Sequence, residues 1–210
     1  IRIANTSPHH SLWILVPHGQ LHDITIPGLP NNVVPDVIVP VEYEKVYMFF
    51  GTDVYVYDIF LDTFSSIGSI TVGTQDAIYY NGYVYFSNGN DNELLGRIDV
   101  STDTITTNFA TFLLIPSGSV NYMRKPMTVL HNQLYIGNEH YVALVDDTGT
   151  FVGDALDIEE QYRITTLANL SNELLIGTEG KKDDRGFRQQ QSKLYRWNTW
   201  SETYSSEAFI

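Results

Sequence analysis

A short pattern that recurs along the chain constrains its fold more than any other feature. The pattern is an apolar strand followed by a small residue and then a polar one. Four clear copies and one weaker first copy occur, at Tyr47–Thr52, Val84–Asn88, Leu134–Asn138, Leu174–Thr178 and, for the weaker one, Leu12–Val16. Successive copies are 35, 36, 50 and 40 residues apart. The spacings are counted from Val16 to Gly51, then to Ser87, Gly137 and Gly177. A period of about 20 to 50 residues is typical of proteins built from tandem structural units.

The segments around each copy repeat as well. Three copies follow a hairpin turn, at Asn81-Gly82, His131-Asn132 and Ser171-Asn172. Asn-Gly is a strong hairpin signal because both residues tolerate positive φ angles. After each copy come an alternating third strand, a tight polar turn and a closing strand. The third strands are Val54–Tyr57, Leu95–Val100, Tyr141–Val145 and Leu194–Trp197, and the polar turns are 61–63, 101–104, 146–149 and 198–201. Four strands joined in this way form an antiparallel meander.

These units predict an all-β fold, a β-propeller of four-stranded antiparallel blades with about five blades in this chain. No segment has sustained helical periodicity. A parallel solenoid has shorter repeats and a sandwich does not repeat itself, so an irregular β-sandwich is the remaining alternative. We expect each blade to bury both faces against its neighbours, and the small residue after the second strand to let adjacent blades approach closely.

The prediction treats residues 1–210 as a single propeller domain or a fragment of a larger one. Residues 1–40 form an irregular, Pro-rich first unit, and residues 41–210 form four clearer blades. A closed ring of five blades requires the strand at Arg2–Ala4 to pair with the final blade. If it does not, we expect further blades outside these residues.

Composition argues against several classes of partner. The chain has 12 Lys and Arg against 25 Asp and Glu, a formal charge of −13. An acidic surface repels phosphate backbones and anionic lipid, so we expect no nucleic-acid partner. No apolar run approaches the about 20 residues that span a bilayer, so we expect no membrane insertion. The absence of cysteine excludes disulfides, thiolate metal sites and cysteine nucleophiles.

Two segments depart from the repeat. Asn108–Pro126 lengthens the longest unit, and Glu179–Ser192 is a polar insertion that we interpret as an exposed hairpin loop. Propeller loops often carry contacts, so Arg185 and Arg188 of this insertion are candidate binding residues. A solvated loop without a binding role is the alternative.

Aromatic residues near the end of the chain are candidates for a sugar-binding platform. Alternation places Tyr195 and Trp197 on one face of a strand, whereas Trp200 lies in the following turn. We take Trp200 and Tyr195 as candidate binding residues. Packing between blades is the alternative for the strand residues, and Trp200 is the one expected to be exposed.

Two groups of residues resemble metal ligands. His18, His22 and Asp23 could contribute to a zinc site, but zinc needs a third ligand in fixed geometry. The oxygen-rich run Asn88–Glu93 resembles a calcium loop but lacks the central glycine. Polar turn and loop positions explain both groups more simply, so we predict no metal site and no cofactor.

Carboxylates near the inner strands raise the possibility of glycoside hydrolysis. Asp36 and Asp76 are the candidates, with Glu42 a weaker one. The two catalytic groups must lie about 5–10 Å apart in a pocket, which the sequence does not show. The chain also lacks a Gly-x-Ser-x-Gly motif and a phosphate-binding glycine loop. We therefore predict a protein without catalytic residues and keep a glycoside hydrolase or lyase as an alternative.

The second half of the chain carries a resemblance to a known group of proteins. The relevant succession is Ala155–Ile158, Tyr162–Leu167, Leu174–Thr178 and Leu194–Ser201. It resembles β-propeller domains in structural proteins of tailed bacteriophages, over residues 127–210. The resemblance implies a component of the virion, an extracellular particle, such as a tail, tail-tip or capsid-surface protein in a symmetric assembly. It also implies that the natural chain continues past Ile210.

These observations together predict a non-enzymatic structural or binding module of a phage virion. Its expected partners are other virion proteins and, for host attachment, a host-surface glycan. A glycan-binding, lectin-like propeller is the alternative function, ahead of the glycoside hydrolase or lyase.

Overall fold

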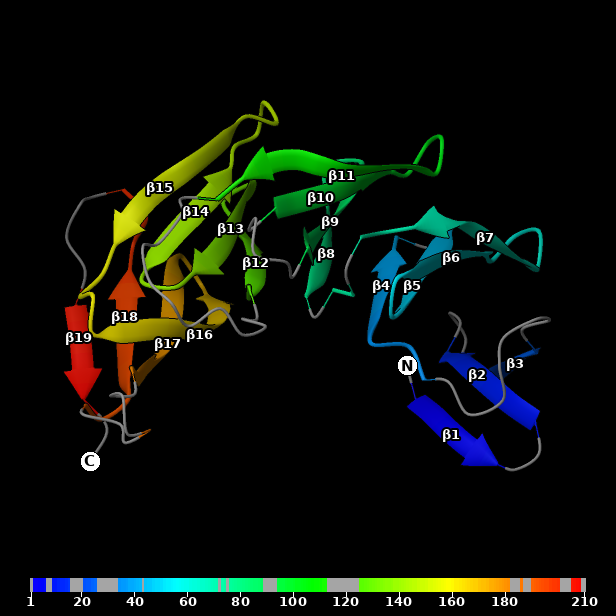
Figure 1. Ribbon diagram of the computed structural model, residues 1–210, viewed down its shortest axis with the longest axis horizontal. Coiled ribbons are helices and arrows are strands. Elements are labelled where there is room, and N and C mark those ends of the chain that lie inside the picture. The colour runs from blue at the N-terminus through cyan, green and yellow to red at the C-terminus, as the bar shows by residue number, and fades with distance from the viewer. Residues whose placement is uncertain are drawn as a thin grey trace.

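The computed structural model of the chain consists of strands arranged in five sheets (Figure 1). It describes residues 2–6, 9–15, 21–25, 34–42, 44–71, 73–74, 76–88, 94–112, 125–181, 186, 190–200 and 205–208, and for 2–6, 9–15, 21–25, 88 and 205–208 it describes the backbone alone. One sheet has three strands and four sheets have four. The fold predicted from the repeat, all-β with four-stranded antiparallel blades, is confirmed.

The three-stranded N-terminal sheet contains β1 (Arg2–Thr6), β2 (His9–Leu15) and β3 (Leu21–Thr25). We number the four-stranded sheets blades 1 to 4. Blade 1 contains β4 (Val37–Val41), β5 (Lys45–Phe50), β6 (Asp53–Asp58) and β7 (Thr63–Ser69). Blade 2 contains β8 (Ala77–Tyr80), β9 (Tyr83–Asn88), β10 (Leu94–Asp99) and β11 (Thr104–Thr111).

Blade 3 contains β12 (Met127–Leu130), β13 (Gln133–Asn138), β14 (Tyr141–Val145) and β15 (Phe151–Asp157). Blade 4 contains β16 (Tyr162–Leu170), β17 (Glu173–Gly180), β18 (Lys193–Trp197) and β19 (Ser205–Ala208). Every blade is an antiparallel meander in chain order. The apolar repeat of the sequence is therefore the second strand of each blade.

The blades follow one another around an arc (Figure 1). The first strand of each blade lies next to the first strand of the following one, β4 beside β8, β8 beside β12 and β12 beside β16. The last strands lie at the outside of the arc. This radial order is that of a propeller, and it differs from the two facing layers of a sandwich.

The predicted hairpin turns form because their residues take positive φ angles. Asn81 and Gly82 have φ of 46° and 82°, and His131 and Asn132 have φ of 50° and 55°. Two successive residues with positive φ match the twist of the flanking strands. The turn chemistry read from the sequence therefore explains the register of these hairpins.

The second strands of blades 1 and 3 are buried on both faces, as expected for a blade between two neighbours, whereas β17 of blade 4 alternates between buried and half-buried residues. Five successive residues from Val46 to Phe50 are buried in β5, and Leu134–Asn138 are buried in β13. One cluster of buried side chains draws on both blade 3 and blade 4, including Tyr135, Leu167 and Trp197. Three of the four clusters of buried side chains join adjacent blades in this way, and the fourth consists of residues of blade 1.

The small residue after the second strand is a glycine in blades 1, 3 and 4, and the structural reason for it differs among these three blades. A Cβ on Gly137 would lie 2.6 Å from Ile164 Cγ2 in blade 4, so here the expected close approach of blades is confirmed. A Cβ on Gly177 would meet Thr166 of its own blade, at 3.4 Å. Gly51 has open space around it but a φ of 59°, so its turn requires a residue that adopts positive φ.

Some elements extend beyond their predicted limits. Blade 1 begins at Val37 and includes Pro40, which lies in the edge strand β4, where a missing N–H is tolerated. Asn108 belongs to β11, whereas residues 113–124 lie outside the described residues.

The N-terminal strand does not pair with the last blade in the part of the chain that the structure describes. The strand at Arg2–Ala4 pairs with β2, with Arg2 opposite Trp13, and β19 pairs with β18. Among the described residues, the pairing between the N-terminal strand and the final blade that a closed five-bladed ring requires is not present.

Candidate functional site

One end of every blade carries two hairpin turns, the first turn between strands one and two and the third turn between strands three and four. Antiparallel order places both turns at the same end of the sheet. We call this end the hairpin face. Its first turns are residues 42–44, 81–82, 131–132 and 171–172, and its third turns are 59–62, 100–103, 146–150 and 198–200.

The third turns share a cap. In each blade the side-chain oxygen of an Asp or Asn accepts the N–H of the residue two positions later, at 2.8–3.0 Å. The four capping residues are Asp58, Asp99, Asp146 and Asn198. An Asx cap of this kind satisfies the backbone and fixes the shape of a turn. The turns of the hairpin face are therefore preorganised.

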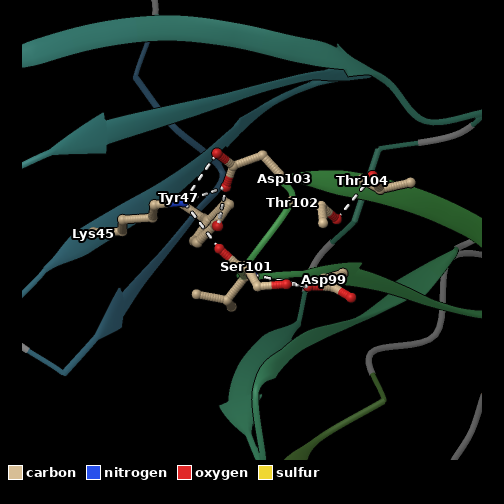
Figure 2. Close-up of polar contacts among 8 residues, drawn as sticks. Lys45, Tyr47, Asp99, Ser101, Thr102, Asp103 and Thr104 are labelled. Carbon is tan, nitrogen blue, oxygen red and sulfur yellow. Dashed lines mark hydrogen bonds and ion pairs between the residues drawn. The ribbon is translucent and has the colours of Figure 1, made fainter.

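The hairpin face also joins adjacent blades. Figure 2 shows Lys45 and Tyr47 of blade 1 reaching Asp103 in the third turn of blade 2. The Lys45 ammonium lies 2.8 Å from the Asp103 carboxylate and 2.9 Å from the Val100 carbonyl oxygen. The Tyr47 hydroxyl donates to the same carboxylate. Burial is the main cause that raises the pKa of Tyr47 above its ordinary value, and the Asp103 carboxylate raises it further. The Tyr47 hydroxyl therefore keeps its proton.

The other two boundaries are joined in the same way. The Tyr80 hydroxyl of blade 2 donates to the carbonyl oxygens of Asn132 at 2.7 Å and Asp146 at 3.2 Å, both in blade 3. At the next boundary His131 Nδ1 of blade 3 lies 3.3 Å from Thr199 Oγ1 of blade 4. At each boundary, side chains at the first turn of one blade reach the third turn of the next.

Trp200 lies at the last of these boundaries. Its side chain is 79% exposed, so the predicted exposure is confirmed. Its ring centroid lies 5.3 Å from that of His131, with 37° between the two planes. Thr199 beside it has a φ of 67°. The structure therefore pairs the exposed indole with an imidazole from the preceding blade, which the sequence did not indicate.

Tyr195 does not belong to this exposed surface. Its exposed fraction is 0%, and it packs with Trp197 in the core between blades 3 and 4. Its hydroxyl donates to Glu159 Oε2 at 3.2 Å. The prediction of Tyr195 as part of an exposed sugar platform is wrong, because the face of β18 that carries Tyr195 and Trp197 packs against blade 3, whereas Arg196 on the other face is exposed.

Several other candidates lie outside the described residues. These are Arg185, Arg188, His18, residues 89–93, and the side chains of His22, Asp23 and Asn88. Across the described part of the chain, no three His, Asp or Glu side chains are grouped so that they could hold a metal ion. In that same part, no helix is long and apolar enough to cross a membrane.

The carboxylates proposed for glycoside hydrolysis lie at two ends of the blades. Asp36 and Asp76 both lie just before the first strand of their blade. The Asp36 carboxylate accepts the N–H of Gly51 at 2.7 Å. Glu42 lies at the other end of β4, about 20 Å along the strand, so it cannot pair with Asp36 for this chemistry. Catalysis by Asp36 and Asp76 stays an alternative hypothesis.

The hairpin face carries most of the exposed large apolar side chains of the described residues. Phe60 is 76% exposed and Leu61 70%, both in the third turn of blade 1, and Leu170 lies beside the first turn of blade 4. The sequence pattern predicted a polar turn in blade 1 and did not indicate this pair. Alignment of the four third turns would have found it, because blade 2 has Ser101 and Thr102 there.

The same face is acidic. Within two residues of its turns, the described residues include two cations, Lys45 and Arg196, each paired with a carboxylate. They include nine carboxylates, at Glu42, Glu44, Asp58, Asp62, Asp99, Asp103, Asp146, Asp147 and Glu173. The face therefore combines exposed apolar groups with a negative potential.

The opposite end of blades 3 and 4 carries a buried ionic contact. The Glu139 carboxylate is almost inaccessible and lies 3.2 Å from Arg163 Nε and 3.3 Å from Lys181 Nζ, both at blade 4. The backbone carbonyl of Glu139 also accepts the N–H of Ile164 at 2.7 Å. This contact holds the boundary between the two blades, and nothing in the sequence pattern indicated it.

Comparison with solved structures shows the fold. The chain is a β-propeller domain, similar to the computationally designed Ika4 protein with a TM-score of 0.54 and 12% identity, over 82% of this chain and 94% of that one. It is also similar to the extracellular domain of the putative one component system BT4673 from B. thetaiotaomicron, with a TM-score of 0.59 and 16% identity, over 95% of this chain and 28% of that one. The N-terminal domain of Nup159 gives a TM-score of 0.55 and 13% identity, over 82% and 47% of the two chains.

The chain spans less than half the length of the latter two structures. No protein-family model matches it, and no curated protein matches it. At these identities the likeness concerns the fold alone. None of the structures named above connects the chain with bacteriophages, so the virion role is taken up below as a proposal.

Proposed function

We propose that this propeller is a non-catalytic binding module of a tailed-phage virion, and that its hairpin face docks on another virion protein within a symmetric assembly. One observation carries the docking surface, the exposed pair Phe60-Leu61 in the capped third turn of blade 1. The virion context comes from the resemblance of residues 127–210. The location is accordingly the outside of the particle.

The internal repeat shows that the apolar pair is not needed to form its turn. In blade 1 the Asp58 carboxylate accepts the N–H groups of Phe60 and Leu61, both at 2.9 Å. Blade 2 forms the corresponding cap with Ser101, at 2.8 Å. Exposed apolar side chains on a preorganised turn favour association, because burying them in an interface costs little loop entropy.

Charge limits the partners further. The nine carboxylates of the hairpin face favour a partner with basic residues around an apolar pocket. They oppose nucleic acid and anionic lipid, so we propose neither as a partner. Joined blades supply a rigid support for such a surface.

The proposal is tested first by the genes beside the one that encodes this chain, and then by binding. Neighbouring portal, tail or capsid genes support a virion role, whereas an operon of cellular sugar transporters contradicts it. The purified chain is then titrated against the purified products of those genes by biolayer interferometry. The double variant Phe60→Ser, Leu61→Thr should lose binding about tenfold or more without loss of stability.

A matched control is Val34→Thr, which removes an exposed apolar side chain from the segment that precedes β4, outside the hairpin face. Equal binding by the double variant and the unaltered chain contradicts docking through this turn.

The second candidate function is attachment to a host-surface glycan, favoured by the exposed indole of Trp200 beside His131.

A further inference from the structure

We propose that Trp200 and His131 form a subsite for an uncharged sugar ring at the boundary between blades 3 and 4. The inference rests on the attachment part of the proposed function and names its residues and ligand chemistry. It is independent of the Phe60-Leu61 surface, which lies in a different blade.

The Trp200 indole is exposed but its backbone is fixed. Its N–H donates to Asn198 Oδ1 at 3.0 Å. The preceding Thr199 has a φ of 67°, a region that β-branched residues rarely adopt. The Thr199 Oγ1 atom lies 3.3 Å from Nδ1 of His131 in blade 3. Backbone strain of this kind persists where surrounding contacts enforce it, and it is common at binding sites.

The two rings offer complementary chemistry to a sugar. The indole presents an uncovered apolar face, since 79% of the side chain is exposed. The imidazole lies alongside it at 5.3 Å and contributes a ring nitrogen that can bond a hydroxyl group. A pyranose ring has an apolar C–H face and a polar edge, so the pair fits both. Burial of one indole face is the main attractive contribution.

Comparison of the repeats argues that the indole is not there for the fold. The residue at the same position of the cap is Phe60 in blade 1, Ser101 in blade 2 and Thr148 in blade 3, so the turn forms with or without an aromatic ring. An exposed Trp is unfavourable in water. Its presence on a strained and anchored turn therefore points to a ligand.

Electrostatics select the class of sugar. The chain carries a formal charge of −13, and both cations near the turns of the hairpin face are already paired with carboxylates. Sialic acids and uronic acids would be repelled by this surface. The proposal therefore commits to neutral hexoses or N-acetylhexosamines.

The test is a glycan array followed by solution titration. The purified chain is applied to oligosaccharides ending in glucose, galactose, mannose, N-acetylglucosamine or N-acetylgalactosamine, and to sialylated and uronate-containing ones. The oligosaccharide that binds most tightly is then titrated into the protein, and its dissociation constant is measured by tryptophan fluorescence and by calorimetry. We expect a neutral glycan to bind, and Trp200→Ala to weaken it about tenfold or more, the size of one lost stacking contact.

Three further variants separate the roles. His131→Ala should weaken binding less than Trp200→Ala, and Trp200→Phe should retain part of it because a stacking face remains. The double variant Phe60→Ser, Leu61→Thr should bind the glycan normally, which separates this site from protein docking. Three outcomes would each overturn the inference. They are no binding to any neutral glycan, tighter binding of the anionic glycans, and unchanged binding by a folded Trp200→Ala variant.

Discussion

The Tyr47 hydroxyl of blade 1 donates a hydrogen bond to the carboxylate of Asp103 in blade 2. Tyr47 is fully buried, and Lys45 binds the same carboxylate at 2.8 Å (Figure 2). One carboxylate at the tip of a turn thus satisfies a neutral and a charged donor from the preceding blade. The blade boundary is held by this polar contact as well as by its apolar core.

Removal of the acceptor should destabilise the domain. Asp103→Ala leaves the buried Tyr47 hydroxyl and the Lys45 ammonium without their carboxylate, and should lower the free energy of unfolding by about 2–3 kcal/mol. Tyr47→Phe removes only one donor and should cost about 1 kcal/mol. Urea unfolding followed by circular dichroism measures both. Asp147→Ala, at an exposed carboxylate, is the control and should change little; an equal effect of all three variants contradicts the assignment.

The sequence predicted the features that depend on local chemistry. The second strands were found because a run buried on both faces must be apolar along its whole length, as in Val46–Phe50. The first turns were found because Asn81-Gly82 is suited to positive φ. Trp200 was expected to be exposed because it lies in the turn beyond the end of a strand.

The sequence did not predict the contacts between blades. Lys45 and Asp103 are 58 positions apart, and nothing local identifies them as partners. Alternation placed Tyr195 and Trp197 on one face but could not show whether that face met solvent or another blade. The same limit applies to His131 and Trp200, because their proximity depends on how two blades pack.

Two glycines at equivalent positions should respond differently to alanine. A Cβ at Gly137 would lie 2.6 Å from Ile164 Cγ2 and 3.0 Å from Pro126 Cγ, so Gly137→Ala must push blades 3 and 4 apart. We expect a loss of about 1–3 kcal/mol in thermal unfolding. Gly177→Ala meets Thr166 at an ordinary 3.4 Å and should be neutral or slightly stabilising. A neutral Gly137→Ala would contradict the close approach.

Stability should depend on the ionisation of the turn caps. Hydrogen bonds from the Thr148 hydroxyl and from the backbone N–H groups of Thr150 and Thr148 hold the pKa of Asp146 below its ordinary value. Because folding lowers this pKa, the carboxylate contributes stability above about pH 4 and loses it as the pH falls through the folded value. Asp146→Asn should therefore flatten the decline of stability below pH 4, measured by urea unfolding from pH 7 to pH 2. An unchanged pH profile contradicts the cap.

Glu139 combines a charge effect with a backbone effect, and substitutions can separate the two. Its carboxylate is buried between Arg163 and Lys181, whose side chains are about one third exposed. Glu139→Gln should lower stability by about 1–2 kcal/mol, a value reduced by solvent screening of the cations. The exposed Glu160→Gln is the matched control and should be neutral.

The backbone of Glu139 has a φ of 54°, which costs an L-residue energy that glycine avoids. Glu139→Ala and Glu139→Gly both remove the ion pairs, but the glycine variant also relieves the strained backbone. Glu139→Gly should therefore be more stable than Glu139→Ala by about 1 kcal/mol in urea unfolding. If the alanine variant is the more stable one, the left-handed conformation is not what the turn between β13 and β14 requires.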